Sequence, residues 1–181
     1  MTKTITQNRE SGFTLLELLL VIGVAALLLI GGIATYRLVS DGNKTTEATR
    51  LLLTLRQELQ TMGQQQGGTY NGLGYTSTSN VQTQPLVASG VLRLNQRNPF
   101  NGNIIVTPQT SAEGVTDGNV DVEFGNISKP ACIKLVQAIN TANEVVTISV
   151  AGTSVGTLPV TAANATSACT GSVNIITWRF P

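Results

Sequence analysis

Apolar residues are concentrated in one uninterrupted run near the start of the chain, from Phe13 to Ile33. As an α-helix this run would be about 31 Å long at about 1.5 Å per residue, which matches the roughly 30 Å hydrocarbon core of a bilayer. The small residues Ser11 and Gly12 stand before the run, whereas in a secretory signal peptide they would follow a shorter apolar core. The pattern therefore predicts a membrane-spanning helix over residues 13–35 and places any cleavage site before it.

Downstream of residue 35 the apolar positions recur with the period of an amphipathic helix, which we expect to cover residues 36–66. Its apolar face carries four leucines and a methionine, namely Leu51, Leu52, Leu55, Leu59 and Met62. Its opposite face is polar, with Arg50, Gln57 and Gln60. Two glycines, Gly67 and Gly68, end it. We expect the apolar face to pack on the chain's own globular domain; binding of a partner helix is the alternative.

Residues 67–181 predict a globular head with more strand than helix, since short runs rich in β-branched residues alternate with turn signals. Residues 69–100 are interpreted as a long connecting region. The predicted strands cover 103–107, 119–124, 144–150 and 172–180, and the predicted helices cover 128–139 and 162–168. The predicted fold class is α+β: a long N-terminal helix, membrane-spanning in its first half and amphipathic in its second, packed on an antiparallel sheet with short helices.

The composition fits one membrane helix and one extracytoplasmic domain. The chain has 181 residues, of which 12% are charged, with a net charge of +1 and no histidine. It has no basic patch for nucleic acid. Without histidine, catalysis needs paired carboxylates, lysines or tyrosines. The acidic residues of the head show no such spacing and are interpreted as solvated surface charges: Glu113, Asp117, Asp121, Glu123 and Glu144. We therefore predict no enzyme, no cofactor and no metal site.

One charged residue, Glu17, lies inside the apolar run. An ionised carboxylate in hydrocarbon costs roughly 2.5 to 3.5 kcal/mol on insertion scales, so such a group generally has a partner. Cleavage after Gly12 would leave Phe13 as the new N-terminal residue, with its amine one helical turn from Glu17. The carboxylate would then have a candidate cation; the alternative is that Glu17 only reaches the membrane interface.

The sequence from Gly12 to Glu17, GFTLLE, followed by the apolar run, resembles the processing and assembly signal of bacterial type IV pilins and the related pseudopilins. The resemblance implies that a prepilin peptidase removes residues 1–12 as a leader by cutting after Gly12, and that the amine of Phe13 is then methylated. It also implies that Glu17 is the assembly glutamate. The resemblance thus implies a structural filament subunit; a plain signal-anchored protein is the alternative.

The same resemblance implies a location and partners. Before assembly the chain would lie in the inner membrane with its head in the periplasm, and after assembly in an extracellular pilus, or fimbrium. Its partners would be further copies of itself, the prepilin peptidase, an inner-membrane assembly platform with its ATPase, and an outer-membrane secretin.

A strand at the C-terminus, just after a cysteine, resembles the type IVb subclass of pilins, in which the last strand lies inside the sheet. The short leader departs from that subclass. The chain would be a major pilin of the thin-pilus or bundle-forming kind, serving adhesion, bacterial aggregation or conjugative mating. The alternatives are a pseudopilin of a type II secretion system, a minor pilin, and a membrane-anchored periplasmic binding domain.

The two cysteines, Cys132 and Cys169, both lie in the predicted periplasmic head. Two cysteines without a histidine do not make a zinc site, and their separation is not that of a C-x-x-C redox motif. In an oxidising compartment we expect them to form a disulfide, contributing on the order of 3 to 4 kcal/mol by closing the loop between them. The pilin resemblance agrees, since that family commonly has one C-terminal disulfide.

Glycines interrupt the long helix at Gly31 and Gly32 and again at Gly42, within the stretch 40–43. Many type IV pilins have a proline in the apolar segment, where the helix extends on assembly, and this segment has none. A glycine in a helix interior costs about 1 kcal/mol relative to alanine. We therefore expect the helix to loosen in a filament first at Gly31 and Gly32, and then at Gly42.

Overall fold

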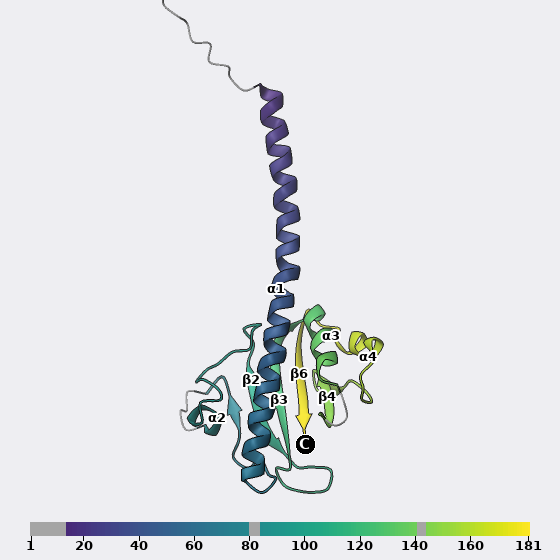
Figure 1. Cartoon of the computed structure of the whole chain (residues 1–181). Coiled ribbons are helices and arrows are strands. Elements are labelled where there is room, and N and C mark those ends of the chain that lie inside the picture. The colour runs from purple at the N-terminus through teal and green to yellow at the C-terminus, as the bar shows by residue number, and fades with distance from the viewer. Residues whose placement is uncertain (1–13, 80–83, 141–143) are drawn as a thin grey trace, which may run out of the picture. The chain divides into compact units, whose positions relative to one another are not determined.

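The computed structural model describes residues 14–79, 84–140 and 144–181, and within the long helix it describes residues 31–38 without their side chains. The chain divides into two compact units, one ending at Ser40 and one formed by Asp41–Pro181. Helix α1 (Leu15–Gln65) contributes to both (Figure 1). The second unit is the head, and the features below belong to it unless stated otherwise.

The apolar face of α1 is part of the hydrophobic core of the head. Leu52, Leu55 and Leu59 are each at most 1% exposed, and Leu51 and Met62 are partly buried against the same core. This confirms the prediction that the leucine stripe packs on the chain's own domain. Removing these side chains from water supplies much of the driving force that holds the helix on the head.

Helix α1 ends in the way its glycines predict. The N–H of Gly67 donates to the carbonyl of Gln64 and the N–H of Gly68 to the carbonyl of Gly63, at 3.2 and 2.9 Å. Gly67 has a φ of 76°, in the left-handed region that side chains disfavour. This is the Schellman arrangement, in which a glycine reverses the chain and satisfies the last carbonyls of a helix.

One six-stranded antiparallel sheet forms the centre of the head, in the order β1-β2-β3-β6-β4-β5. Its strands are β1 (Tyr75–Thr76), β2 (Ile104–Gln109), β3 (Asn119–Ser128), β4 (Thr147–Val150), β5 (Thr153–Ser154) and β6 (Val173–Phe180). The C-terminal strand β6 therefore lies inside the sheet, between β3 and β4. Among the described residues, three short helices accompany it: α2 (Pro85–Ala88), α3 (Lys129–Ala138) and α4 (Ala162–Ala168).

Alternation along the strands decides which face of the sheet meets α1. On β6, Ile176, Trp178 and Phe180 are fully buried in the core that α1 shares, whereas Thr177 and Arg179 lie on the other face and are half-buried. The ring of Trp178 contacts that of Phe124 on β3 edge to face, with 5.5 Å between centroids. Figure 1 shows the part of α1 that belongs to the head running along the sheet.

The predicted strands are present, with corrections to their bounds. The first begins at Ile104 and extends to Gln109, and β3 continues past a break in its register between Phe124 and Ile127 to reach Ser128. The predicted strand over 144–150 is confined to 147–150. The two-residue edge strands β1 and β5 were not predicted, because pieces this short have no periodicity to detect.

Helix α1 is continuous through Gly31, Gly32 and Gly42 in the single chain. The hydroxyls of Thr45 and Thr46 donate to the carbonyls of Asp41 and Gly42, at 2.7 and 3.2 Å. Such bonds to the carbonyl four residues back slightly destabilise a helix. Loosening at these glycines in a filament therefore stays a prediction, with two local features that favour it at Gly42.

A glycine at position 102 is required by a close approach of two backbones. Residues 97–102 form a turn that packs on β3, and a Cβ at Gly102 would lie 1.9 Å from the carbonyl oxygen of Gly125. We expect Gly102→Ala to lower the free energy of unfolding by about 3 kcal/mol, since backbone cannot move aside cheaply. The measurement is denaturant unfolding of the full chain in mild detergent, followed by fluorescence of the single tryptophan, Trp178. Gly42→Ala is the control, because a Cβ at Gly42 meets nothing within 4 Å; equal midpoints for the two variants would contradict the packing argument.

Candidate functional site

The predicted assembly glutamate, Glu17, lies in the first turn of α1 and is exposed. Its N–H donates to the hydroxyl oxygen of Thr14 at 3.3 Å, and the N–H of Leu18 donates to the carbonyl of Thr14 at 3.2 Å. Thr14 therefore caps the helix by accepting a hydrogen bond from one of its unpaired N–H groups. The carboxylate of Glu17 lies close to the positive end of the helix dipole.

The sequence around Glu17 also indicates a local role for this residue at the start of the helix. Thr14 at the cap and Glu17 three residues later form the T-x-x-E pattern of a capping box, in which the acidic side chain supports the start of the helix. Glu17 therefore has two candidate roles: capping the start of α1 and pairing with a cation. Substitutions can separate the two roles.

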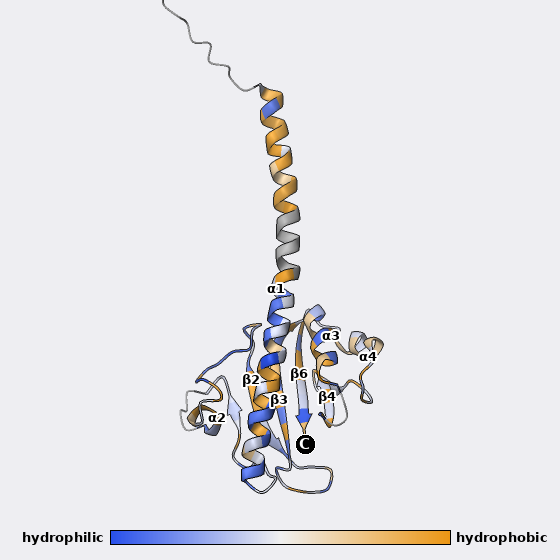
Figure 2. Ribbon diagram, viewed as in Figure 1, coloured by the Kyte–Doolittle hydropathy of each residue, from blue (hydrophilic) through white to orange (hydrophobic). Residues whose placement is uncertain are grey.

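Around Glu17, the first part of α1 consists mostly of hydrophobic residues (Figure 2). In the single chain Leu15 and Leu16 are 77% and 74% exposed, and Leu27 to Ile30 are 67% to 72% exposed. A surface formed by this many exposed apolar side chains is typical of a region that is covered by lipid or by other protein chains.

The other residues of the predicted processing signal, Gly12 and Phe13, lie outside the described residues. The predicted membrane-spanning segment, 13–35, also extends beyond them. Across the residues that the structure describes, no helix combines the length and apolar character needed to cross a membrane. The geometry of the cleavage site and the span thus stay predictions.

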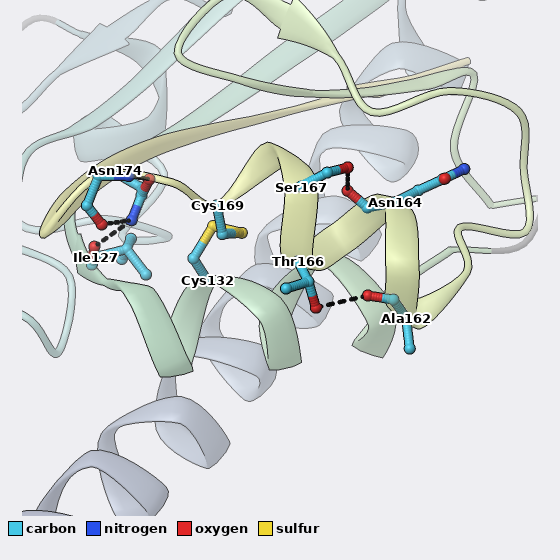
Figure 3. The surroundings of a disulfide bond; sticks show 9 residues. Ile127, Cys132, Ala162, Asn164, Thr166, Ser167, Cys169 and Asn174 are labelled. Carbon is cyan, nitrogen blue, oxygen red and sulfur yellow. Dashed lines mark hydrogen bonds between the residues drawn. A yellow bond between two sulfur atoms is a disulfide. The ribbon is translucent and has the colours of Figure 1, made fainter.

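The two cysteines form the expected disulfide. Cys132 in α3 and Cys169 at the end of α4 are bonded, and both are fully buried (Figure 3). The bond joins the helix that follows β3 to the segment that leads into β6. It therefore links the connection between β3 and β4 to the connection between β5 and β6.

A buried asparagine supports the same segment. Asn174, 5% exposed, donates from its side-chain nitrogen to the carbonyls of Gly171 and Ile127, at 2.9 and 3.3 Å, and its oxygen accepts from the N–H of Gly171 at 3.2 Å. Figure 3 shows this side chain next to the disulfide. Its amide satisfies backbone groups that would otherwise be unpaired where β6 begins.

The prediction that the acidic residues of the head are all solvated surface charges is wrong, because two of them form ion pairs. Asp121 accepts two hydrogen bonds of 2.7 Å from the guanidinium of Arg179 on the neighbouring strand, and only 15% of its side chain is exposed. This bond and the nearby carboxylate raise the pKa of Arg179. Glu144 pairs with Arg56 of α1 at 3.2 Å. Cross-strand and helix-to-loop pairs of this kind depend on the fold and leave no mark in the local sequence.

Asp121 and Arg179 line a polar groove of about 210 Å³ on the sheet face opposite α1, together with hydroxyl-bearing residues of β4 and β6. The carboxylate and the guanidinium in this groove bind each other. The groove is most simply explained as the solvated face of the sheet.

Glu123 lies on the same face, half-buried beside Asp121. Burial, and secondarily the charge of Asp121, raises its pKa above the ordinary value of 4.5. Because the folded chain holds the proton of Glu123 more tightly than the unfolded chain does, ionisation of Glu123 lowers the free energy of unfolding. This destabilisation disappears at low pH, where the carboxyl group is protonated in both states. We expect Glu123→Gln to raise the unfolding midpoint at about pH 7.5 and to have no effect near pH 4.

The matched control is Glu113→Gln. Hydrogen bonds from its own N–H and from Ser111 lower the pKa of Glu113, so this substitution is expected to leave the midpoint unchanged or lower it at neutral pH. Thermal unfolding of the full chain, followed by Trp178 fluorescence at both pH values, makes the comparison. A Glu123→Gln gain that persisted undiminished in acid would show that ionisation is not its cause.

Two family models match this chain. A model of the prokaryotic N-terminal methylation motif matches residues 7–33, the part that contains Gly12, Phe13 and Glu17. A model described as PilS N terminal matches residues 44–180, nearly the whole head.

Known proteins agree with the models. Prepilin peptidase-dependent protein D of Escherichia coli (strain K12) is 27% identical over 135 residues, covering 69% of this chain and 92% of that protein. The crystal structure of TcpA, a type IV pilin from Vibrio cholerae El Tor biotype, matches with a TM-score of 0.56 at 13% identity, over 77% of this chain and 99% of that one.

A type IV b pilin from Salmonella typhi matches with a TM-score of 0.51 at 17% identity, over 76% of this chain and 97% of that one. At such identities the two structures establish the fold, and the two family models, which together cover most of the chain, establish the family. With the methylation motif before the long helix and the PilS model over the head, the chain belongs to the PilS family and is a type IV pilin.

Proposed function

We propose that this pilin is the major structural subunit of a type IVb pilus. It is inserted in the inner membrane as a prepilin, cleaved after Gly12 and methylated on the amine of Phe13, and it is then polymerised into an extracellular filament. The filament serves adhesion, bacterial aggregation or contact between mating cells.

The observation that carries this proposal is the methylation motif, which places the carboxylate of Glu17 at the start of a helix whose apolar side chains are exposed. In lipid the exposed surface is covered by acyl chains, and in a filament by the same helix of neighbouring subunits. Glu17 of one subunit then pairs with the methylated amine of Phe13 in another. The low dielectric that makes a lone carboxylate unfavourable strengthens the pair when both partners are present.

The subclass is supported by the place of the last strand. β6 ends at Phe180 and lies between β3 and β4 rather than at an edge of the sheet. An internal C-terminal strand is the arrangement that the resemblance to type IVb pilins implies. The structural match to a type IV b pilin agrees with it.

The assembly machinery follows from the same proposal. The prepilin peptidase cuts the leader, an inner-membrane platform with its ATPase extracts the subunit, and an outer-membrane secretin passes the filament. No active site is needed in the subunit, which acts as a substrate of these enzymes and as a building block.

The second candidate is a pseudopilin of a type II secretion system, and a minor pilin is a variant of the first. The Escherichia coli relative is named only for its dependence on prepilin peptidase, which all three share. The disulfide between Cys132 and Cys169 favours a pilin, since major pseudopilins more often lack one.

Mass spectrometry of filaments sheared from intact cells tests the proposal. A major pilin is expected to dominate that fraction as a chain that starts at N-methylated Phe13 and retains its disulfide. A trace amount would indicate a minor pilin. Complete absence from the fraction, with the mature chain retained in the inner membrane, would favour the pseudopilin.

The residue before the cut gives a prediction about processing. The peptidase has to accommodate position 12 closely, so Gly12→Ala is expected to be cleaved far better than Gly12→Val, because the latter adds a branched side chain. Immunoblotting distinguishes precursor from mature chain by size, and expression of the peptidase with each variant provides the comparison. Equal accumulation of mature protein from both variants would refute the assignment of the cleavage site.

A further inference from the structure

A groove with basic residues in its wall lies between α1 and α3. It has a volume of about 550 Å³ and is lined by Arg50 and Lys134, by the hydroxyls of Thr46 and Thr49, and by Ala138. Arg50 and Lys134 are both exposed. Neither belongs to the two ion pairs found among the described residues, Arg56–Glu144 and Arg179–Asp121.

The acidic residues near this groove do not line it. Asp41 accepts a hydrogen bond from the hydroxyl of Ser128 at 3.3 Å. Glu47 lines a different groove, together with Arg97 and Arg50. The α1–α3 groove therefore presents positive charge to whatever enters it.

The turn between β2 and β3 has the opposite character. Residues 110–118 carry Glu113 and Asp117, with Val115 between them exposed to 47%. The turn is fixed by its own hydrogen bonds: the N–H of Ser111 donates to the carbonyl of Val115 at 2.9 Å, and the N–H of Gly118 donates to the same carbonyl at 3.1 Å. An acidic turn with an apolar residue at its centre is thus held in one shape.

The groove and the turn lie at opposite ends of the head. The N–H of Tyr70, just beyond the end of α1, donates to the carbonyl of Asp117 at 2.7 Å and ties the turn to that end. The hydrogen bond from Ser128 to Asp41 ties the start of α3 to the residue of α1 at which the head begins. Figure 1 shows α3 at one end of the head and the β2–β3 turn at the other.

We propose that the turn 110–118 of one subunit docks in the α1–α3 groove of another copy in the filament. Glu113 and Asp117 then meet Arg50 and Lys134, and Val115 packs against the exposed methyl group of Ala138. Two different surfaces at opposite ends of one body form a head-to-tail contact, which repeats without closing and so builds a helical polymer. Opposite charge on the two surfaces fixes their register and rejects like-charged ends. The inference rests on the proposed function, because polymerisation is what brings the copies together.

A charge exchange tests the contact in the full chain. Glu113→Lys alone and Lys134→Glu alone are each expected to reduce the yield of sheared filaments by at least about fivefold, since each places like charges together. The double variant, with the two charges exchanged, is expected to recover to within about twofold of the original. Arg93→Glu, at an exposed site outside both surfaces, is the control and should leave the yield unchanged.

Cross-linking tests the contact independently of filament yield. Val115→Cys combined with Thr46→Cys is expected to give a ladder of disulfide-linked multimers when assembled filaments are oxidised. Val115→Cys combined with Thr153→Cys, on the edge strand β5, should give none. Processed monomer containing the native disulfide is checked first, so that misfolded variants are recognised.

The outcomes separate this inference from the proposed function. If the unaltered chain forms no filaments, the proposed function fails and the inference with it. If filaments form, but the 115–46 pair gives no ladder or the exchanged double variant assembles no better than the single variants, the docking of the turn is wrong and the filament assignment stands. A ladder together with recovery in the double variant supports the contact.

Discussion

Replacing Glu17 with alanine is expected to leave a chain that is cleaved, folded and retained in the inner membrane, yet absent from surface filaments. The head is a separate compact unit that begins at Asp41, so its core and disulfide do not depend on this side chain. What is lost, under the proposed function, is the carboxylate that pairs with the amine of Phe13 in a neighbouring subunit. Leaving that amine unpaired among apolar helices is costly, because removing one partner of a buried ion pair destabilises by about 3 to 5 kcal/mol. Electron microscopy and the sheared-filament yield are the measurements.

Glu17 also stands three residues after the capping Thr14, so alanine alone does not separate pairing from capping. Glu17→Gln keeps a side chain that serves in a capping box but removes the charge, and it is expected to fail as completely as alanine. Thr14→Ala removes the cap, keeps the charge and is expected to assemble. Normal piliation by the Glu17→Gln variant would end the pairing hypothesis, whereas loss of piliation with Thr14→Ala would place the function in the helix start instead.

The long helix was predictable because its signals are local. The stripe of leucines and the terminal glycine pair act through residues three or four apart, and the structure contains both consequences. The apolar run forms helix over its described part, while the membrane span predicted from it stays a prediction. Gly67 predicted the end of the helix for the same reason, since the left-handed conformation that ends a helix involves the backbone of a single residue.

The head was predictable in outline and not in detail. The alternation of Val120, Val122 and Phe124 marked β3 correctly, yet its continuation to Ser128 crosses a break in register that no alternating pattern reveals. The short edge strands have their conformation because β2 and β4 offer unpaired backbone groups to them. Their sequences alone do not favour a strand.

The pairing of charged residues was the least predictable feature. Asp121 and Arg179 are far apart in sequence and lie opposite each other only because β3 and β6 are neighbours. The cysteines were predictable despite a similar separation, because with only two cysteines in the chain the partner is fixed by number and compartment. The disulfide was predictable because each cysteine had only one possible partner in the chain, although the two are far apart in sequence.

Removing the disulfide is expected to have the largest effect on the stability of the head. Cys132 and Cys169 are separated by 37 residues, and closing a loop of that length contributes roughly 4 kcal/mol in the chain-entropy model. That is a large share of the roughly 5 to 15 kcal/mol by which a typical domain is stable. The Cys132→Ala/Cys169→Ala variant should therefore unfold at a much lower denaturant concentration, measured by Trp178 fluorescence of the full chain.

The loss is also expected to have a local signature. α4 ends at the disulfide and most of its residues are exposed, so amide hydrogen exchange over 161–172 should accelerate more than exchange over β3. The Cys132→Ser/Cys169→Ser variant is the comparison: it leaves hydroxyls in a fully buried site and is expected to be less stable than the alanine pair. An alanine variant that unfolds at the same denaturant concentration as the original chain would mean that the loop is held by its packing, with Asn174 and the core around α3 sufficient to order it without the covalent bond.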